Sequence, residues 1–222
     1  MHWSTQYLPL VLVMLFIGML LGVRGIRFQR RFGYSPFRFP RWRYGSTAAF
    51  LSRMLVVVLS AIVLLAAVAT LAPDRLEQFD PLYRYRTPAL LTAGTLIMLV
   101  GGALVWRAQE DMRDAWRVGI NPREQTRLVT HGLFQFCRNP IYLGLQVALV
   151  GFVGLVPGCL SLALFATSLV LLRMQCRLEE SHLLSQHGAA YEEYSRRVGR
   201  FVPRTGRRAW RSTDHKPDGI KP

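Results

Sequence analysis

Long apolar runs that contain no charged residue except Arg53 are separated by short arginine-rich segments, and this pattern constrains the fold of the chain more than any other feature. The hydrocarbon core of a bilayer is about 30 Å thick, and a helix needs about 20 apolar residues to cross it. Runs of that length, or close to it, occupy Tyr7–Val23, Ala48–Ala72 and Pro88–Trp106. A soluble basic protein would intersperse its charge, whereas here the formal charge of +15 is segregated from the apolar residues. We therefore expect an all-α, polytopic transmembrane helix bundle.

A fourth apolar run, Ile141–Leu172, is too long for a single span and is broken by Val156-Pro157-Gly158. Pro-Gly pairs mark turns, so this run predicts two short helices joined in a tight transmembrane hairpin. With the three runs that precede it, the hairpin brings the expected number of spans to about five.

The distribution of arginine predicts the orientation. The loop Arg24–Thr47 holds seven arginines and no acidic residue, whereas Pro73–Thr87 holds three arginines balanced by three acids. The segment Arg107–Asn139 and the tail after Leu172 are again rich in arginine. Because cytoplasmic loops carry the excess of Lys and Arg, we expect the N-terminus outside and the C-terminus in the cytosol. The same rule explains the positive charge as a topology signal and a contact with anionic lipid, so we expect no nucleic-acid partner.

Other features outside the spans are less informative. Phe32–Gly45 interleaves aromatic residues with arginine, which suits a segment lying on the lipid headgroups. Arg204–Pro222 is polar and rich in Gly and Pro, and we expect it to be disordered. The three cysteines form no CxxC pair and the histidines lack ligand spacing, so we expect no metal site.

Polar residues gather where the hairpin begins: Thr130, His131, Gly132, Gln135, Arg138, Asn139, Pro140 and Tyr142. Proline is favoured in the first turn of a helix, and asparagine is a good N-cap, so Asn139-Pro140 predicts a helix start. A helix start does not require His131, Arg138 or Tyr142. These residues are therefore candidates for a binding site.

The second arm of the hairpin ends in a second polar group. With about 3.6 residues per turn, Arg173, Arg177 and Glu180 share one stripe, while Glu179 points elsewhere. Solvated ion pairs at a helix end are one explanation. However, a hairpin brings the ends of both arms to one membrane face, so this group and the helix start must be neighbours. Together they suit a cationic, adenine-bearing ligand: carboxylates for an ammonium group, helix-terminal N–H groups for a carboxylate, and an aromatic face for a sulfonium.

The order of these short motifs resembles a known family. His131-Gly132-(x)5-Arg138-Asn139-Pro140-x-Tyr142-x-Gly144 precedes Glu179-Glu180-x-x-Leu183-(x)4-Gly188-x-x-Tyr191-x-x-Tyr194 and Val198-x-Arg200-Phe201-x-Pro203. This pattern is similar to the isoprenylcysteine carboxyl methyltransferases and their relatives, the phospholipid N-methyltransferases. It covers Leu128–Pro203, which divides the chain into a transmembrane region at 1–127, a methyltransferase-like region at 128–203, and a tail at 204–222.

The resemblance implies an integral membrane methyltransferase that uses S-adenosylmethionine without a metal. The residues expected to bind the cofactor are His131, Gly132, Asn139, Pro140, Tyr142, Glu179, Glu180 and Tyr191. Arg138 and Arg200 are candidate catalytic residues that would orient an anionic substrate group by bidentate hydrogen bonds. Glu179 is the candidate base for an acceptor that must lose a proton. The carboxyl methyltransferases usually have histidine where this chain has Asn139, which leaves the acceptor group open.

The acceptor, the partners and the activity itself admit alternatives. The expected partners are membrane lipids and a lipophilic small-molecule, lipid or lipidated substrate carrying a carboxylate, an amine or a thiol. An arginine-x-proline-x-tyrosine helix start is also found in NADPH-dependent membrane reductases of the steroid 5α-reductase type, and a non-catalytic membrane scaffold is a third possibility. The expected location is the bacterial inner membrane or the endoplasmic reticulum, depending on the host.

Overall fold

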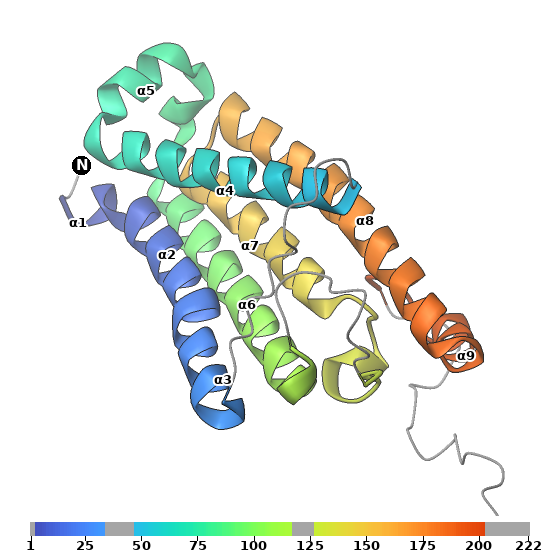
Figure 1. Ribbon diagram of the computed structural model, residues 1–222. Helices are drawn as coiled ribbons and strands as arrows, with labels where there is room; N and C mark the ends of the chain where they lie inside the picture. Colours follow the sequence, from blue (N-terminus) through green and yellow to red (C-terminus); the bar gives the residue numbers. More distant parts are fainter. Residues whose placement is uncertain (1–2, 34–46, 117–126, 203–222) are drawn as a thin grey trace, which may run out of the picture.

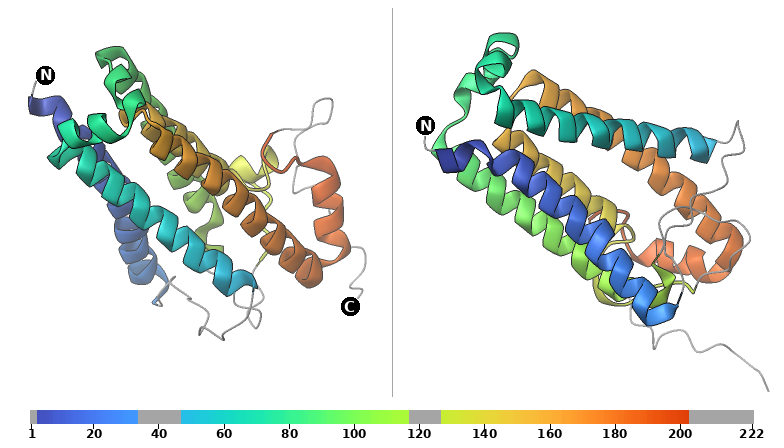
Figure 2. Two further views of the ribbon diagram at one scale, coloured as in Figure 1. Left: turned by 90° about the horizontal axis from the view of Figure 1, so that it is seen from above. Right: turned by 60° about the vertical axis from the view of Figure 1, so that its left-hand side comes forward.

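The computed structural model describes residues 3–33, 47–116 and 127–202, and the long segments of these ranges are helical. Helices run side by side along one direction, with α5 at one end of the bundle and α9 at the other (Figures 1 and 2). The elements are α1 (Trp3–Gln6), α2 (Leu8–Ile17), the π-helical turn η1 (Gly18–Val23), α3 (Arg24–Phe32), α4 (Thr47–Leu71), α5 (Pro73–Phe79), η2 (Pro81–Tyr85), α6 (Pro88–Met112), η3 (Arg113–Ala115), η4 (Gly132–Gln135), α7 (Pro140–Leu155), α8 (Cys159–His187) and α9 (Ala189–Arg197). The predicted all-α architecture is confirmed. The predicted interfacial segment at 34–46 and the predicted disordered tail lie outside the described residues.

Among the described residues, four helices are long and apolar enough to cross a membrane: Leu8–Arg31, Thr47–Leu71, Pro88–Met112 and Cys159–His187. The remaining predicted span, α7, has 16 residues, or about 24 Å at 1.5 Å per residue. Its partner α8 has 29 residues and is about 44 Å long, which exceeds the hydrocarbon core. The C-terminal end of α8 therefore extends beyond the core, and this is the end that carries Glu179 and Glu180.

The first span continues past the point where charge was expected to end it. Residues Arg24–Phe32 form α3 in direct continuation of η1, although the sequence predicted a loop from Arg24 onward. Arg24 is only 6% exposed because its guanidinium donates to Glu110 Oε1 at 2.6 Å and to the Gln109 carbonyl at 2.7 Å. A charge with such partners can enter the bundle, and the basic residues near the end of α3 also complement the helix dipole.

The hairpin turn lies where the sequence predicted it, between α7 and α8. Asp80 caps the start of α8 by accepting a hydrogen bond from the Leu160 amide at 3.1 Å. A Cβ at Gly158 would lie 2.4 Å from Asp80 Oδ2, so a larger residue there would displace the capping carboxylate. Arg86, which is 7% exposed, donates from Nε to the Leu155 carbonyl at 3.2 Å and fixes the end of α7. These contacts anchor the closed end of the hairpin and leave its open end for the site.

Helices α6 and α7 approach closely because small residues line their contact. A Cβ at Gly101 would lie 2.4 Å from the Ala148 backbone nitrogen, and one at Gly151 would lie 2.5 Å from the Met98 nitrogen. Small residues of this kind let membrane helices pack with their backbones near one another. Because α7 begins at Pro140, this contact also sets the position of the hairpin's open end.

The cysteines allow a test of the predicted orientation. Cys159 at the start of α8 is exposed, whereas Cys137 is buried, and burial raises the pKa of its thiol to about 11. A maleimide attacks the thiolate, and with a raised pKa the thiolate is scarce at pH 7.5. We expect a membrane-impermeant maleimide to label Cys159 on intact cells and to leave Cys137 unlabelled at pH 7.5 even after lysis. A Cys159→Ser variant is the control. Labelling of Cys159 only after lysis would mean that the chain has the opposite orientation to the one predicted.

Candidate active site

Backbone pairing joins the start of the hairpin to the segment after α9. Cys137 and Gly199 form an isolated parallel bridge. The Arg138 amide donates to the Gly199 carbonyl at 2.9 Å, and the Asn139 amide donates to the Arg200 carbonyl at 3.2 Å. Two motifs that are about 60 residues apart in the sequence are therefore brought together at the open end of the hairpin.

Glu180 is the centre of a hydrogen-bonded network at this junction. Arg200 donates from NH2 to Glu180 Oε2 at 2.7 Å and from Nε to Oε1 at 3.0 Å. Arg138 donates from NH2 and Nε to Oε1 at 3.2 and 3.3 Å, and the Asn139 amide donates to the same oxygen at 2.9 Å. One carboxylate from α8 thus holds three predicted site residues from two other segments.

The two arginines of this network differ in exposure. The side chains of Arg138 and Glu180 are 11% and 12% exposed, whereas that of Arg200 is 38% exposed. Hydrogen bonding to Glu180 raises the pKa of Arg200, so this group stays charged. Arg138 also donates to the Ser195 carbonyl at 2.6 Å, which ties the end of α9 to the hairpin. The sequence predicted that both arginines would orient a substrate anion, but in this structure Glu180 already neutralises part of their charge.

Asn139 departs from one sequence expectation. It stands at the N-cap position of α7, and Pro140 occupies the first turn as predicted. Its side chain, however, makes no capping hydrogen bond to the helix and donates to Glu180 instead. The expected N-cap role is therefore wrong for the side chain, because a charged acceptor from α8 lies within its reach and forms the stronger hydrogen bond.

Glu179 and Glu180 point in different directions, as the helical period predicted. The Tyr142 hydroxyl donates to Glu179 Oε1 at 2.5 Å, so Glu179 faces α7 inside the hairpin. The Gln175 side chain, one turn earlier on α8, lies against both of these groups. Arg173 and Arg177 are exposed. The interior of the hairpin therefore contains a carboxylate and a phenol in direct contact.

Tyr191 on α9 is 4% exposed, and burial is the main cause that raises its pKa. Glu180, Arg138 and Arg200 are its charged neighbours. Within the described ranges the Tyr191 hydroxyl has no hydrogen-bond partner, whereas the hydroxyl of Tyr194 donates to the Phe134 carbonyl at 2.7 Å. Tyr191 thus supplies a neutral, buried hydroxyl beside the network.

His131 and Gly132 lie toward the end of α6. The Leu133 amide donates to Asp111 Oδ2 at 2.9 Å, and a Cβ at Gly132 would lie 2.2 Å from the Asp111 Cγ. Gly132 also has a positive φ of 61°, which favours glycine. Asp111 is 6% exposed, and it positions the segment that leads into the hairpin.

Comparison with known proteins agrees with this arrangement. Residues 89–190 match the family described as phospholipid methyltransferase, a range that contains α6, the hairpin and most of the network. This range is a little under half of the chain, and it is the part that resembles the phospholipid methyltransferase family. This family match starts within α6, whose end carries Asp111, so the matched region includes that helix as well as the hairpin.

Three curated relatives of this chain are bacterial. The nickel-cobalt-cadmium resistance protein NccN of Alcaligenes xylosoxydans xylosoxydans is 31% identical over 117 residues, 52% of this chain and 51% of that protein. The methanethiol S-methyltransferase of a Pseudomonas species is 27% identical over 183 residues, 78% of this chain and 67% of that protein. Methanethiol S-methyltransferase 2 of Bradyrhizobium diazoefficiens is 36% identical over 72 residues, 32% of this chain and 27% of that protein. The chain thus spans about half of the length of the first relative. With its spanning helices, this chain is an integral membrane protein, and its bacterial relatives point to the inner membrane.

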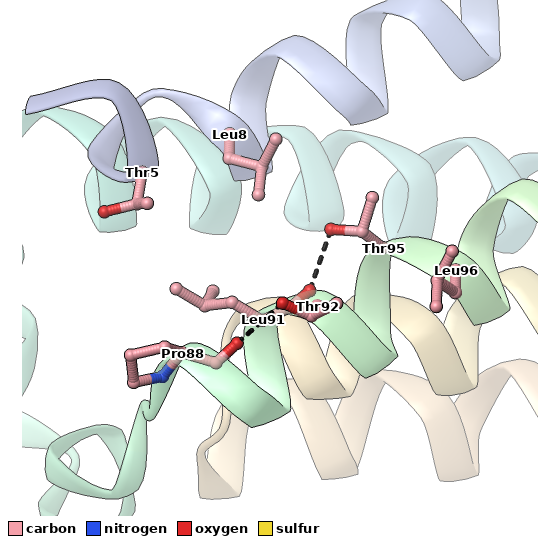
Figure 3. A pocket seen from close by; sticks show the side chains of 7 residues that line it. All are labelled: Thr5, Leu8, Pro88, Leu91, Thr92, Thr95 and Leu96. Atoms are coloured by element: carbon pink, nitrogen blue, oxygen red, sulfur yellow. Dashed lines mark hydrogen bonds between the residues drawn. The ribbon is translucent and has the colours of Figure 1, made fainter. Parts of the chain in front are cut away.

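A groove of about 250 Å³ lies between α1, the start of α2 and the first turns of α6 (Figure 3), at the end of the bundle away from α9 (Figure 1). Its lining residues are Thr5, Leu8, Pro88, Leu91, Thr92, Thr95 and Leu96. The hydroxyls of Thr92 and Thr95 donate to carbonyls of their own helix at 2.9 and 2.8 Å. This lining contains no ionisable side chain and suits an acyl chain of the bilayer. The candidate active site is therefore the polar network and not this groove.

Sequence reasoning missed the contacts that support the site from α6. Asp111, Glu110 and Arg24 were read as parts of basic or polar flanks of spans. The ion pair between Arg24 and Glu110 joins the first span to α6, and Arg24 also lies 5.5 Å from the centre of the Trp116 ring. The only available signal was the presence of paired acidic residues at the end of an otherwise apolar run.

Proposed function

We propose that this chain transfers a methyl group from S-adenosylmethionine to a small or lipophilic acceptor at the cytosolic face of the membrane. The observation that carries this proposal is the network around Glu180, which joins the two parts of the family-like pattern. The match of residues 89–190 to the phospholipid methyltransferase family supports it.

The residues of the site fit this cofactor by their chemistry. Tyr191 has a buried hydroxyl without a partner in the described part of the chain, and the partly exposed Arg200 can bind a carboxylate. Asn139 and Glu180 can form hydrogen bonds with an ammonium group and with the edge of an adenine ring. Tyr142 offers an aromatic face to a sulfonium. When bound, S-adenosylmethionine supplies a methyl group attached to a positively charged sulfur, and this sulfur is a good leaving group. His131 and Gly132 complete the cofactor-binding set that we propose.

The contribution of the protein is then mainly positional. Glu180 fixes Arg138 and Arg200, and through them it holds the end of α9 against the hairpin. A site closed in this way aligns the two reactants and excludes water, which can account for several orders of magnitude in rate. Glu179 lies inside the hairpin and can take a proton from an acceptor that carries one.

The names of two relatives suggest a particular acceptor. Both are methanethiol S-methyltransferases. The candidate acceptors for this chain therefore include a small thiol as well as lipid amines and prenylated carboxylates. The metal-resistance relative carries a name that indicates no acceptor.

The proposal is tested by calorimetric titration of detergent-purified protein with S-adenosylhomocysteine and, separately, with NADPH. We expect S-adenosylhomocysteine to bind with a 1:1 stoichiometry and NADPH to produce no heat of binding. Binding of NADPH alone would favour a reductase of the steroid 5α-reductase type. Binding of neither compound to folded protein would contradict an enzymatic role at this site.

A further inference from the structure

Two glutamines lie one helical turn deeper in the hairpin than the Tyr142–Glu179 contact. Gln146 follows Tyr142 by four residues on α7, and Gln175 precedes Glu179 by four residues on α8. The two helices are joined by a tight turn and run antiparallel, side by side (Figure 1). The residue one turn inward on α7 therefore faces the residue one turn inward on α8. The two glutamines form a second polar layer beneath the first.

This layer has polar atoms that nothing in the described ranges satisfies. Gln175 is 7% exposed, and its Oε1 has no hydrogen-bond partner there. Both Nε2 and Oε1 of Gln146 are buried without a partner there. Buried amide groups are costly unless they are hydrogen-bonded, and native proteins rarely leave them unpaired. Three unpaired atoms beside Glu179 and Tyr142 therefore point to a ligand that satisfies them.

We infer that Gln146 and Gln175 bind the reacting head group of the methyl acceptor, and that this group is a hydrogen-bond donor, a thiol or an amine. The inference rests on the proposed methyltransferase function. Two of the three unpaired atoms are acceptor oxygens, and the neighbouring Glu179 adds a carboxylate. An S–H or N–H group can donate to these oxygens. A carboxylate acceptor would instead be repelled by them and by Glu179.

The same layer gives the transferred proton a destination. As the bond between the acceptor sulfur or nitrogen and the methyl carbon forms, the bond from that carbon to the sulfonium breaks, and its electron pair stays on the departing sulfur. The acceptor proton passes to the Glu179 carboxylate and then to water. Charge and atoms balance without a further reactant, and a carboxylate acceptor would need no such residue.

The test compares three probes that share one alkyl chain: hexanethiol, hexylamine and hexanoate. Their binding to detergent-purified protein saturated with S-adenosylhomocysteine is measured by calorimetry for wild type, Gln146→Leu and Gln175→Leu. We expect wild type to bind the thiol or the amine but not hexanoate, and each variant to lose at least about tenfold in affinity for the bound probe. Leucine has nearly the volume of glutamine. Because both amide atoms of Gln146 are unpaired in the described part of the chain, Gln146→Leu should unfold at or above the wild-type temperature. Gln175→Leu also loses the contact of its amide with Tyr142 and Glu179, and it should unfold at or slightly below that temperature.

Gln109→Leu is the matched control. Gln109 is also buried, at 4% exposure, with an unpaired Oε1 in the described part of the chain, but its Nε2 donates to the Leu20 carbonyl away from the hairpin interior. We expect this variant to bind all probes as wild type does. Unchanged probe affinity in both hairpin variants, or preferential binding of hexanoate, would overturn the inference. Failure of the wild type to bind S-adenosylhomocysteine would instead contradict the proposed function, so the two failures are distinguishable.

Discussion

Replacing Glu180 with glutamine should destabilise the open end of the hairpin and weaken S-adenosylhomocysteine binding by at least about tenfold. Glutamine keeps the shape of the side chain but removes the charge that compensates Arg138, which is 11% exposed. Removing one partner of a buried ion pair typically costs 3–5 kcal/mol. We expect about 3 kcal/mol here, because Arg200 is 38% exposed and water can replace its share. Thermal unfolding and calorimetric titration of the variant measure the two effects.

An exposed ion pair of the same region provides the control. Arg196 donates to Glu192 at 2.6 Å on α9, and the two side chains are 70% and 55% exposed. Glu192→Gln should change stability by no more than about 0.5 kcal/mol and leave ligand binding unaltered. A second variant, Glu180→Gln combined with Arg138→Met, should recover part of the lost stability because it removes the uncompensated buried charge. If Glu180→Gln behaves like Glu192→Gln, the network does not organise the site.

The sequence predicted the parts of this fold that depend on local pattern. Apolar length identified the spans, and the Pro-Gly pair at 157–158 identified the hairpin turn. The hairpin also required the helix start near Asn139 and the acidic pair near Glu180 to be neighbours, which the hydrogen bond between them confirms. The different directions of Glu179 and Glu180 followed from the helical period alone.

Contacts between distant segments could not be predicted in the same way. The first span was expected to end at Arg24 because an unpaired charge is excluded from the bilayer, but its partner Glu110 is 86 residues away. The Asn139 side chain was assigned to its own helix end, whereas its acceptor comes from α8. In each case the local rule was sound, and a long-range partner of opposite charge or better acceptor strength decided the outcome.

Replacing Gly101 with alanine should separate α6 from α7 and lower the stability of the bundle by about 2 kcal/mol, in the range typical of overpacking. The added Cβ would lie 2.4 Å from the Ala148 nitrogen and 2.6 Å from the Gly144 carbonyl oxygen, and these backbone atoms cannot move aside independently. Because α7 carries Tyr142, the shift should also reduce methyl transfer. Thermal unfolding and a methyl-transfer assay on the purified variant measure both effects.

The adjacent residue, Gly102, provides the control that separates the effect of helix packing from the effect of helix propensity. At Gly102 a Cβ would lie 3.5 Å from the Phe16 ring, which is an ordinary contact. Both substitutions gain the same helix propensity, up to about 1 kcal/mol, so the difference between them measures the close approach of α6 and α7 alone. We expect Gly102→Ala to be neutral or slightly stabilising, with wild-type activity. Equal unfolding temperatures for the two variants would mean that α6 and α7 have room to separate, and that their spacing does not set the position of Tyr142 in the site.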